Sequence, residues 1–210
     1  MANILIADDH QVVREGLRQI LSDEPDIGVV GEAQDSQEVL ELAAKQDWDI
    51  VVLDISMPGR GGLDVLKELK KHHPKLPVLI LSMHSEDQYA VRALKAGAAG
   101  YVTKKTAHHE LVQAIKKILQ GGKYISASLA DRLASHLETQ TERPLHESLS
   151  DREYQVMIMI ASGKKTGEIA EELSLSIKTV DNYRARALEK MGLRNNVDLV
   201  HYVLRNNLLD

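Results

Sequence analysis

Acidic, hydroxyl and amino side chains follow four of the five short apolar runs in the first half of this 210-residue chain. In chain order they are Asp8 and Asp9 after residues 3–7, Asp54 after residues 49–53, Ser82 at the end of residues 77–82, and Lys104 after residues 99–103. Each residue type alone is common in caps, turns and solvated surfaces. Caps, turns and solvated surfaces do not readily explain why all of them stand at the end of an apolar run. This shared position indicates that they form one functional site.

Three carboxylates that lie close together repel one another, and a hard divalent cation with oxygen ligands is the simplest way to hold them. Mg²⁺ is the expected ion. The site would then offer a nucleophilic carboxylate, a metal, a hydroxyl donor and an ammonium group. These groups together predict a site that accepts a phosphoryl group and holds it.

The apolar runs that carry these residues alternate with helix-length segments, for instance residues 11–21 and 63–71. Strands that alternate with helices predict a parallel sheet covered on both faces. Five such units predict a doubly wound, flavodoxin-like α/β domain over residues 1–122. In that fold ligands bind at the carboxyl ends of the strands.

The pattern changes after Gly122. Residues 123–148 are mostly polar and predict a linker that is partly helical, with a short helix at residues 129–137. Residues 149–210 predict a second, all-α domain of four helices. Its start and stop signals are a capping box from Ser150 to Glu153, Gly163, a cap at Ser176, and Gly192.

The composition is that of an ordinary folded protein, with 43% hydrophobic and 27% charged residues and a net charge of −5. Cysteine is absent, which excludes disulfides and thiolate metal sites. The first ten residues lack the pattern of a signal peptide, and no apolar run approaches the length of a membrane span. We therefore expect a cytoplasmic protein without a membrane partner.

The motifs DDH, LDISMPGRGGLD, LSMHSED and AGAAGYVTKKT resemble the receiver domain of two-component response regulators over residues 1–122. The resemblance implies that a sensor histidine kinase phosphorylates Asp54. It implies that Asp9, Asp54 and the Ser56 backbone carbonyl bind Mg²⁺, with Asp8 acting through water. It also implies that Ser82 and Lys104 bind the phosphoryl oxygens and that Tyr101 reorients as a switch.

Two further features belong to this resemblance. Ser56 and His84 occupy positions that tune spontaneous dephosphorylation in the family. Lys105 stands where receivers often have a proline, so the turn after Lys104 departs from the usual pattern. The residues with implied chemical roles are unaffected.

The predicted helix from Ser176 to Met191 carries a local excess of basic residues, five against two acidic ones within residues 178–194. Ile177, Val180, Leu188 and Met191 predict its inward face, with Arg184 nearer the wet face. A helix-turn-helix with such a second helix fits the major groove of DNA. Phosphate contacts are expected from Lys178, Thr179, Arg184 and Arg186, and base contacts from Asp181, Asn182 and Ala185. An amphipathic helix with a purely structural role is the alternative.

The stretch from LSDREYQV to KMGLRN resembles the LuxR-type helix-turn-helix, so the whole chain resembles the NarL/FixJ class of response regulators. Lys165 stands where a small capping residue is common, and Thr166 is the expected cap instead. In this class the last helix commonly pairs two copies on promoter DNA. The apolar stripe Val197, Val200, Val203 and Leu204 would then serve as the dimer contact.

Three functions remain open at this point. The first is a transcription regulator switched by phosphorylation, which is not an enzyme acting on free substrates. The second is a Mg²⁺-dependent phosphohydrolase, but haloacid-dehalogenase-type enzymes need an acid where this chain has Ser56. The third is a DNA-binding protein whose receiver only dimerises; such receivers usually lose an acid or the lysine, and this chain keeps them all. The first is favoured.

Overall fold

The computed structural model describes residues 1–210 except 58–60, 84–85, 127–128, 131–143, 207 and 210. The chain divides into two compact units, Met1–Leu133 and Ala134–Asp210. None of the described helices has the length and apolarity that spanning a bilayer requires.

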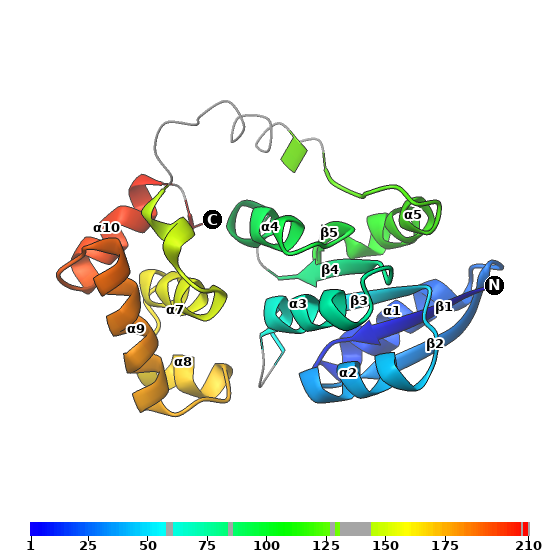
Figure 1. The fold of residues 1–210 in the computed structure, drawn as a ribbon, viewed down its shortest axis with the longest axis horizontal. Helices are drawn as coiled ribbons and strands as arrows, with labels where there is room; N and C mark the ends of the chain where they lie inside the picture. The colour runs from blue at the N-terminus through cyan, green and yellow to red at the C-terminus, as the bar shows by residue number, and fades with distance from the viewer. Residues whose placement is uncertain (58–60, 84–85, 127–128, 131–143, 207, 210) are drawn as a thin grey trace. The chain divides into compact units, whose positions relative to one another are not determined.

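The first unit is a five-stranded parallel sheet covered by helices, in the strand order β2-β1-β3-β4-β5 (Figure 1). Its elements are β1 (Ala2–Ala7), α1 (Gln11–Ser22), β2 (Ile27–Ala33), α2 (Ser36–Lys45), β3 (Ile50–Asp54), α3 (Gly62–His72), β4 (Val78–Ser82), α4 (Glu86–Lys95), β5 (Gly100–Thr103) and α5 (Ala107–Leu119). The predicted doubly wound fold is therefore confirmed, and the four strands that carry the predicted site residues lie within one residue of their predicted bounds.

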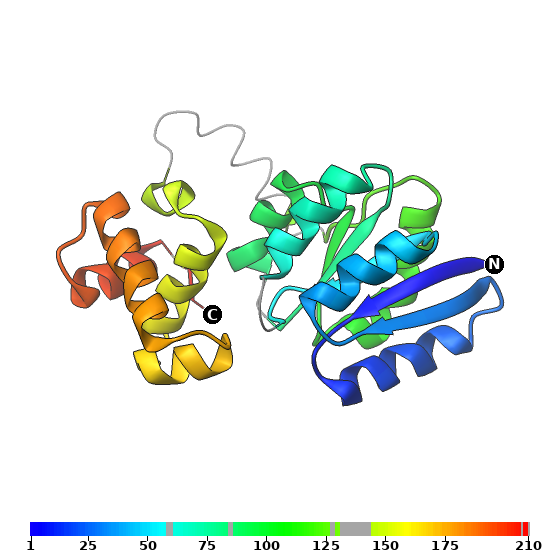
Figure 2. The same ribbon diagram turned by 60° about the horizontal axis from the view of Figure 1, so that its bottom comes forward.

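Both faces of the sheet are buried, which explains why its strands read as continuous apolar runs. Alternate residues of the strands pack with α1 and α5 in one cluster that includes Ile4, Ile6, Ile50, Val52, Leu79 and Leu81. The residues between them, such as Leu5, Val51, Leu53 and Ile80, are equally buried. In Figure 2, α1 lies on the opposite side of β1 from α2. The central strand β3 is completely enclosed, and its carboxyl end is the Asp54 carboxylate.

The sheet continues slightly beyond the boundary predicted at residue 122. Tyr124 forms a parallel bridge with Gly100, and its carbonyl accepts a hydrogen bond from Tyr101 N at 3.2 Å. A side chain at position 100 would place a Cβ 2.7 Å from the Tyr124 carbonyl oxygen. Glycine at the first residue of β5 thus allows the chain after α5 to pair with the edge of the sheet. The predicted helix at residues 129–137 lies mostly outside the described residues.

The second unit is helical: η1 (Leu145–Ser148), α7 (Asp151–Ala161), α8 (Thr166–Glu172), α9 (Ile177–Met191) and α10 (Asn196–Arg205). The capping box at Ser150 and Glu153 is confirmed, and so is the Ser176 cap on α9. Gly163 and Gly192 both have positive φ, which suits glycine after a helix end. The expected cap at Thr166 is wrong, because Thr166 is the first helical residue and Lys165 is the N-cap, without a capping side chain.

An ion pair between a buried acid and a partly exposed lysine joins two helices of this unit. The Glu153 carboxylate lies 2.6 Å from Lys190 Nζ in α9, and it also accepts a hydrogen bond from Ser150 N at 2.8 Å. Burial alone would raise the pKa of Glu153, but the hydrogen bonds from Lys190 and Ser150 outweigh it and lower that pKa. Glu153 therefore serves both the cap of α7 and the packing of α7 against α9.

Candidate functional site

The carboxyl ends of three strands bring the predicted charged residues together. Strand β1 pairs with β3, and Ala7 lies opposite Leu53, so Asp8 and Asp54 emerge side by side. Both carboxylates are completely buried. Lys104, just after β5, places its Nζ 2.9 Å from Asp54 Oδ2 and 2.5 Å from Asp8 Oδ2. One ammonium group thus serves two buried acids that the sequence separates by 46 residues.

The electrostatics of this cluster follow from its burial. Burial raises the pKa of Asp54, and the neighbouring Asp8 raises it further, while Lys104 opposes both effects. Burial would lower the pKa of Lys104, but the Asp54 and Asp8 carboxylates outweigh that effect, so the pKa of Lys104 is raised. Lys104 therefore stays charged. The two acids together carry more negative charge than one lysine can neutralise.

The cluster has the donor set of a hard cation. Single ligand atoms of Asp8, Asp9, His10 and Asp54 all lie within 4.8 Å of one another. The Asp8 Oδ2 atom is buried and, apart from its ion pair with Lys104, accepts no hydrogen bond from the described residues. Because the one lysine is shared with Asp54, a second cation at this buried oxygen would lower the free energy of the cluster. The carboxylates of Asp8, Asp9 and Asp54 fit Mg²⁺ chemically, since that ion prefers oxygen ligands.

Two residues that support the acids went unnoticed in the sequence. His10 Nδ1 lies 2.9 Å from Asp9 Oδ1, and the His10 backbone N donates to Asp8 Oδ1 at 2.9 Å. Arg14 Nη1 donates to the Asp8 carbonyl at 2.7 Å. His10 and Arg14 thus hold the turn that carries Asp8 and Asp9. The sequence signals for them were the position of His10 directly after the two acids and that of Arg14 one helical turn later.

The remaining receiver residues lie around the same sheet edge. Ser82 ends β4 and is completely buried, and its carbonyl accepts a hydrogen bond from Lys104 N at 2.7 Å. Tyr101 is also completely buried. Ser56 N donates to Asp54 Oδ1 at 3.1 Å. The predicted tuning residue His84 lies outside the described residues, and all described peptide bonds are trans, including the one after Lys104.

Gly62 is a further residue of this site that sequence reasoning missed. It begins α3, and its backbone N donates to the Ile55 carbonyl at 3.0 Å. A Cβ at this position would lie 2.4 Å from the Asp54 carbonyl oxygen and 2.6 Å from Ile55 Cα. Only glycine lets α3 begin this close to the strand end that carries Asp54. The glycine pair Gly61-Gly62 was the sequence signal.

In the second unit, α8 and α9 form a helix-turn-helix. The buried residues of α9 are Val180, Ala187 and Met191. The opposite side exposes Lys178, Asn182, Ala185 and Arg186, whereas Thr179, Asp181 and Arg184 are partly buried. Thr179 Oγ1 lies 2.7 Å from the Ser176 hydroxyl, so it also belongs to the first turn of the helix. The side of α9 away from its domain is therefore polar and basic.

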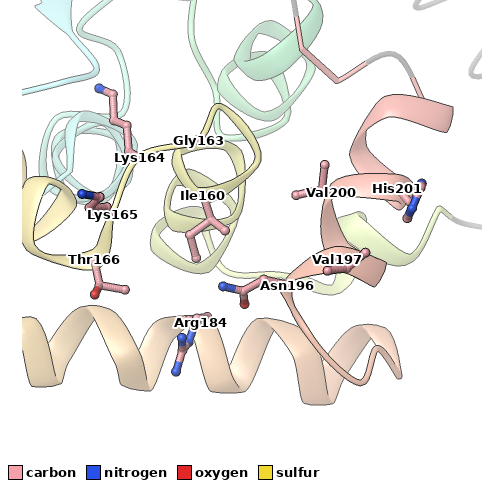
Figure 3. A pocket seen from close by; sticks show the side chains of 10 residues that line it. All are labelled: Ile160, Gly163, Lys164, Lys165, Thr166, Arg184, Asn196, Val197, Val200 and His201. Atoms are coloured by element: carbon pink, nitrogen blue, oxygen red, sulfur yellow. The ribbon is translucent and has the colours of Figure 1, made fainter.

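Arg184 lies nearer the wet face as predicted, with its side chain 36% exposed, but part of that side chain is buried. Its guanidinium Nη2 lies 3.3 Å from the Asp181 carboxylate, and its Nε is buried without a hydrogen bond from the described residues. Arg184 lines a cavity of about 520 Å³ together with Thr166, Asn196 and Val197. Figure 3 shows Arg184 on α9 and the turn from Gly163 to Thr166 around this cavity. The long side chain lies along its own domain, which the helical period alone could not show.

Ile177 departs from its prediction. It was assigned to the inward face of α9, but its side chain is 55% exposed. The buried residues of the helix begin at Val180, one turn later, and Ile177 is the first residue of the helix, with no turn of α9 before it. The other predicted inward residues Val180 and Met191 are buried, and Leu188 is partly buried.

The predicted dimer stripe divides into two parts. Val203 is completely buried within the domain, because it faces inward from α10, and it is not available to a second copy. Val197 and Leu204 are 63% and 55% exposed, and Val200 is partly exposed. The surface left for a dimer contact is therefore made of Val197, Val200 and Leu204.

Comparisons with known proteins agree with both units. The family model for the response regulator receiver domain matches residues 4–116, and that for bacterial regulatory proteins of the luxR family matches residues 147–203. The chain is 38% identical over 209 residues to the response regulator UvrY of Escherichia coli K12, covering 99% of this chain and 96% of UvrY. It is 38% identical over 212 residues to the response regulator GacA of Pseudomonas aeruginosa, covering 100% of this chain and 99% of GacA.

A solved structure is similar over nearly the whole chain. RcsB from Salmonella enterica serovar Typhimurium, bound to promoter rprA in the presence of phosphomimetic BeF3⁻, has a TM-score of 0.67 and 29% identity. The match covers 97% of this chain and 98% of RcsB.

Proposed function

Because this chain belongs to the NarL/FixJ class of response regulators, we propose that it is a transcription regulator whose DNA binding is switched by phosphorylation of Asp54. One observation carries the proposal. The buried Asp54 carboxylate ends the central strand, with Lys104 Nζ at 2.9 Å and the Asp8 carboxylate beside it, in the same chain as a helix-turn-helix.

Asp54 is the proposed phosphoryl acceptor. One of its carboxylate oxygens attacks the phosphorus of the donor, and the bond from phosphorus to the donor's leaving atom breaks. Lys104, already within 2.9 Å of that carboxylate, pairs with the added negative charge. Ser82, one strand away, supplies a hydroxyl to a phosphoryl oxygen. Mg²⁺ held by Asp9, Asp54 and the Ser56 carbonyl, with Asp8 acting through water, supplies charge neutralisation when it is bound.

The donor is proposed to be a sensor histidine kinase, and Asp54 is proposed to be the substrate rather than a catalyst for free phosphate esters. The phosphoryl group would draw the Ser82 hydroxyl and bias the buried ring of Tyr101 and the neighbouring α4. Such a change acts by shifting the populations of two states, not by creating a new fold.

The second unit is proposed to bind double-stranded promoter DNA through α9. Lys178 and Arg186 are exposed on the side of α9 away from its domain, where phosphate contacts are possible. Asn182 and Ala185 share that exposed side and are the favoured base contacts, with Thr179, Asp181 and Arg184 nearer the edge. The promoter-bound RcsB structure supports this assignment by its similarity over 97% of the chain.

A homodimer is the proposed active form. Val197, Val200 and Leu204 would form its contact, and an isologous pair would match an inverted repeat in the DNA. Val203 is left out of this contact because it is buried.

The acceptor is tested by incubating the full chain with Mg²⁺ and a small phosphodonor such as acetyl phosphate, followed by intact mass measurement. The wild type should gain one phosphoryl mass, and Asp54→Ala should gain none. Asp9→Asn should be slowed, because it keeps the acceptor but loses a metal ligand. An adduct that persists in Asp54→Ala would remove Asp54 from the proposal.

A further inference from the structure

Ile177 stands apart from the other apolar residues of α9. Among the residues of this helix, all of which are described, it is the one large apolar side chain that is exposed, at 55%. Isoleucine is also a poorer helix former than alanine, so helix stability gives no reason for it at this position. Packing explains it only in part, because 55% of the side chain stays exposed one turn before Val180, where the buried residues of α9 begin.

The position of Ile177 is well defined by its neighbours. The Ser176 side chain caps the helix by accepting a hydrogen bond from Thr179 N at 3.1 Å, and the two hydroxyls lie 2.7 Å apart. Ile177 is therefore the first residue of a pinned helical turn. Because helical side chains lean toward the amino end of the helix, it lies at the leading tip of α9.

The leading tip of a recognition helix is the part that reaches the base edges in the major groove. The charged neighbours there recognise phosphates or the polar edges of bases. An apolar side chain has one specific partner in that groove, the C5-methyl group of thymine. We infer that Ile177 is a specificity-determining residue that contacts a thymine methyl group in each half-site. This inference rests on the proposed DNA-binding function and names a base for it.

The size of the effect follows from the burial of one methyl group. That burial stabilises a complex by about 0.8 kcal/mol, which corresponds to an about four-fold change in affinity per half-site. Replacement of thymine by deoxyuridine removes this methyl group and leaves the base pairing intact. The expected loss is therefore about four-fold for each contacted thymine and is confined to that position.

The test begins with selection of duplexes from a random pool by the full chain after treatment with Mg²⁺ and acetyl phosphate. Each thymine of the selected site is then replaced by deoxyuridine, and the Kd is measured by fluorescence anisotropy. For the wild type, one thymine per half-site should show the four-fold loss. For Ile177→Ala, binding to the thymine duplex should already be weaker, and the difference between thymine and deoxyuridine at that position should disappear.

Leu145→Ala is the matched control, because Leu145 is 46% exposed and lies on η1, outside the helix-turn-helix. It should keep the four-fold ratio. Ile177→Ala should keep its fold, since alanine is a good helix former at an exposed position, and circular dichroism checks this.

If no position loses its thymine–deoxyuridine difference in Ile177→Ala, the inference is overturned while DNA binding stands. If Ile177→Ala lowers transcription with unchanged DNA affinity, Ile177 contacts another protein and the inference is likewise overturned. If the pool yields no duplex bound more tightly than random DNA, the proposed function itself fails.

Discussion

Removal of the Lys104 ammonium group should destabilise the first unit strongly, because it leaves two buried acids without their shared cation. Lys104 is 8% exposed, and Asp8 and Asp54 are fully buried. Breaking a buried pair by removing one partner costs about 3–5 kcal/mol. We therefore expect Lys104→Met to lower the free energy of unfolding by about 3 kcal/mol at pH 7.5 without Mg²⁺.

The pH dependence of this loss has a definite sign. Burial and Asp8 raise the pKa of Asp54 above its ordinary value of 3.8, and loss of Lys104 removes the group that opposes them. In the folded variant the Asp54 carboxyl therefore holds its proton more tightly than it does in the unfolded chain. The loss of folding stability that comes from ionising Asp54 is absent below the pKa of the unfolded chain, and it grows as the pH rises to the pKa of the folded variant. The deficit of Lys104→Met should therefore be smaller at pH 5 than at pH 7.5.

Urea unfolding followed by tryptophan fluorescence measures this directly, since Trp48, in the first unit, is the one tryptophan of the chain. Asp54→Asn is the partner variant. It removes one acid while leaving Asp8 to pair with Lys104. We therefore expect it to leave the free energy of unfolding nearly unchanged or to raise it. The double variant with Lys104→Met and Asp54→Asn should lose less free energy of unfolding than the two single variants lose in sum. A Lys104→Met protein as stable as the wild type at pH 7.5, or one whose deficit relative to the wild type is larger at pH 5 than at pH 7.5, would refute the reasoning.

Three other outcomes follow from the structure. Mg²⁺ should raise the stability of the wild type to thermal unfolding but not that of Asp9→Asn, and equal shifts would contradict a metal site at Asp9. Gly62→Ala should destabilise by about 1–3 kcal/mol in urea unfolding, because its Cβ would lie 2.4 Å from the Asp54 carbonyl oxygen. Gly16→Ala is the control: nothing lies within 4 Å of its Cβ, and it should stabilise α1 by about 0.5–1 kcal/mol. Lys178→Ala and Arg186→Ala should each reduce the slope of log affinity against log salt concentration by about 0.9 for each bound protomer, and an unchanged slope would remove that residue from the phosphate contacts.

The strand ends were predictable because local sequence determines them. Apolar runs with buried faces predict the sheet, and the residue after each run must lie at its carboxyl edge. Asp8, Asp54 and Lys104 therefore lie together as the alternation of strands and helices implies. Helix caps were equally accessible, since Ser150 and Ser176 each accept from a backbone N three residues away.

The features that sequence reasoning missed depend on contacts between distant segments or on side-chain conformation. The closeness of Gly62 to the Asp54 carbonyl oxygen is a matter of tertiary packing. Ile177 falls near the edge of the buried face of α9, where the helical period cannot decide between burial and exposure. It is the first residue of the helix, so no turn of α9 precedes it.

The affinity of the full chain for a selected duplex, with and without acetyl phosphate and Mg²⁺, tests the switch most directly. Phosphorylation should tighten binding by the wild type and leave binding by Asp54→Asn unchanged. Equal affinities of the wild type in the two states, with the phosphoryl adduct verified by mass, would contradict control of DNA binding through Asp54.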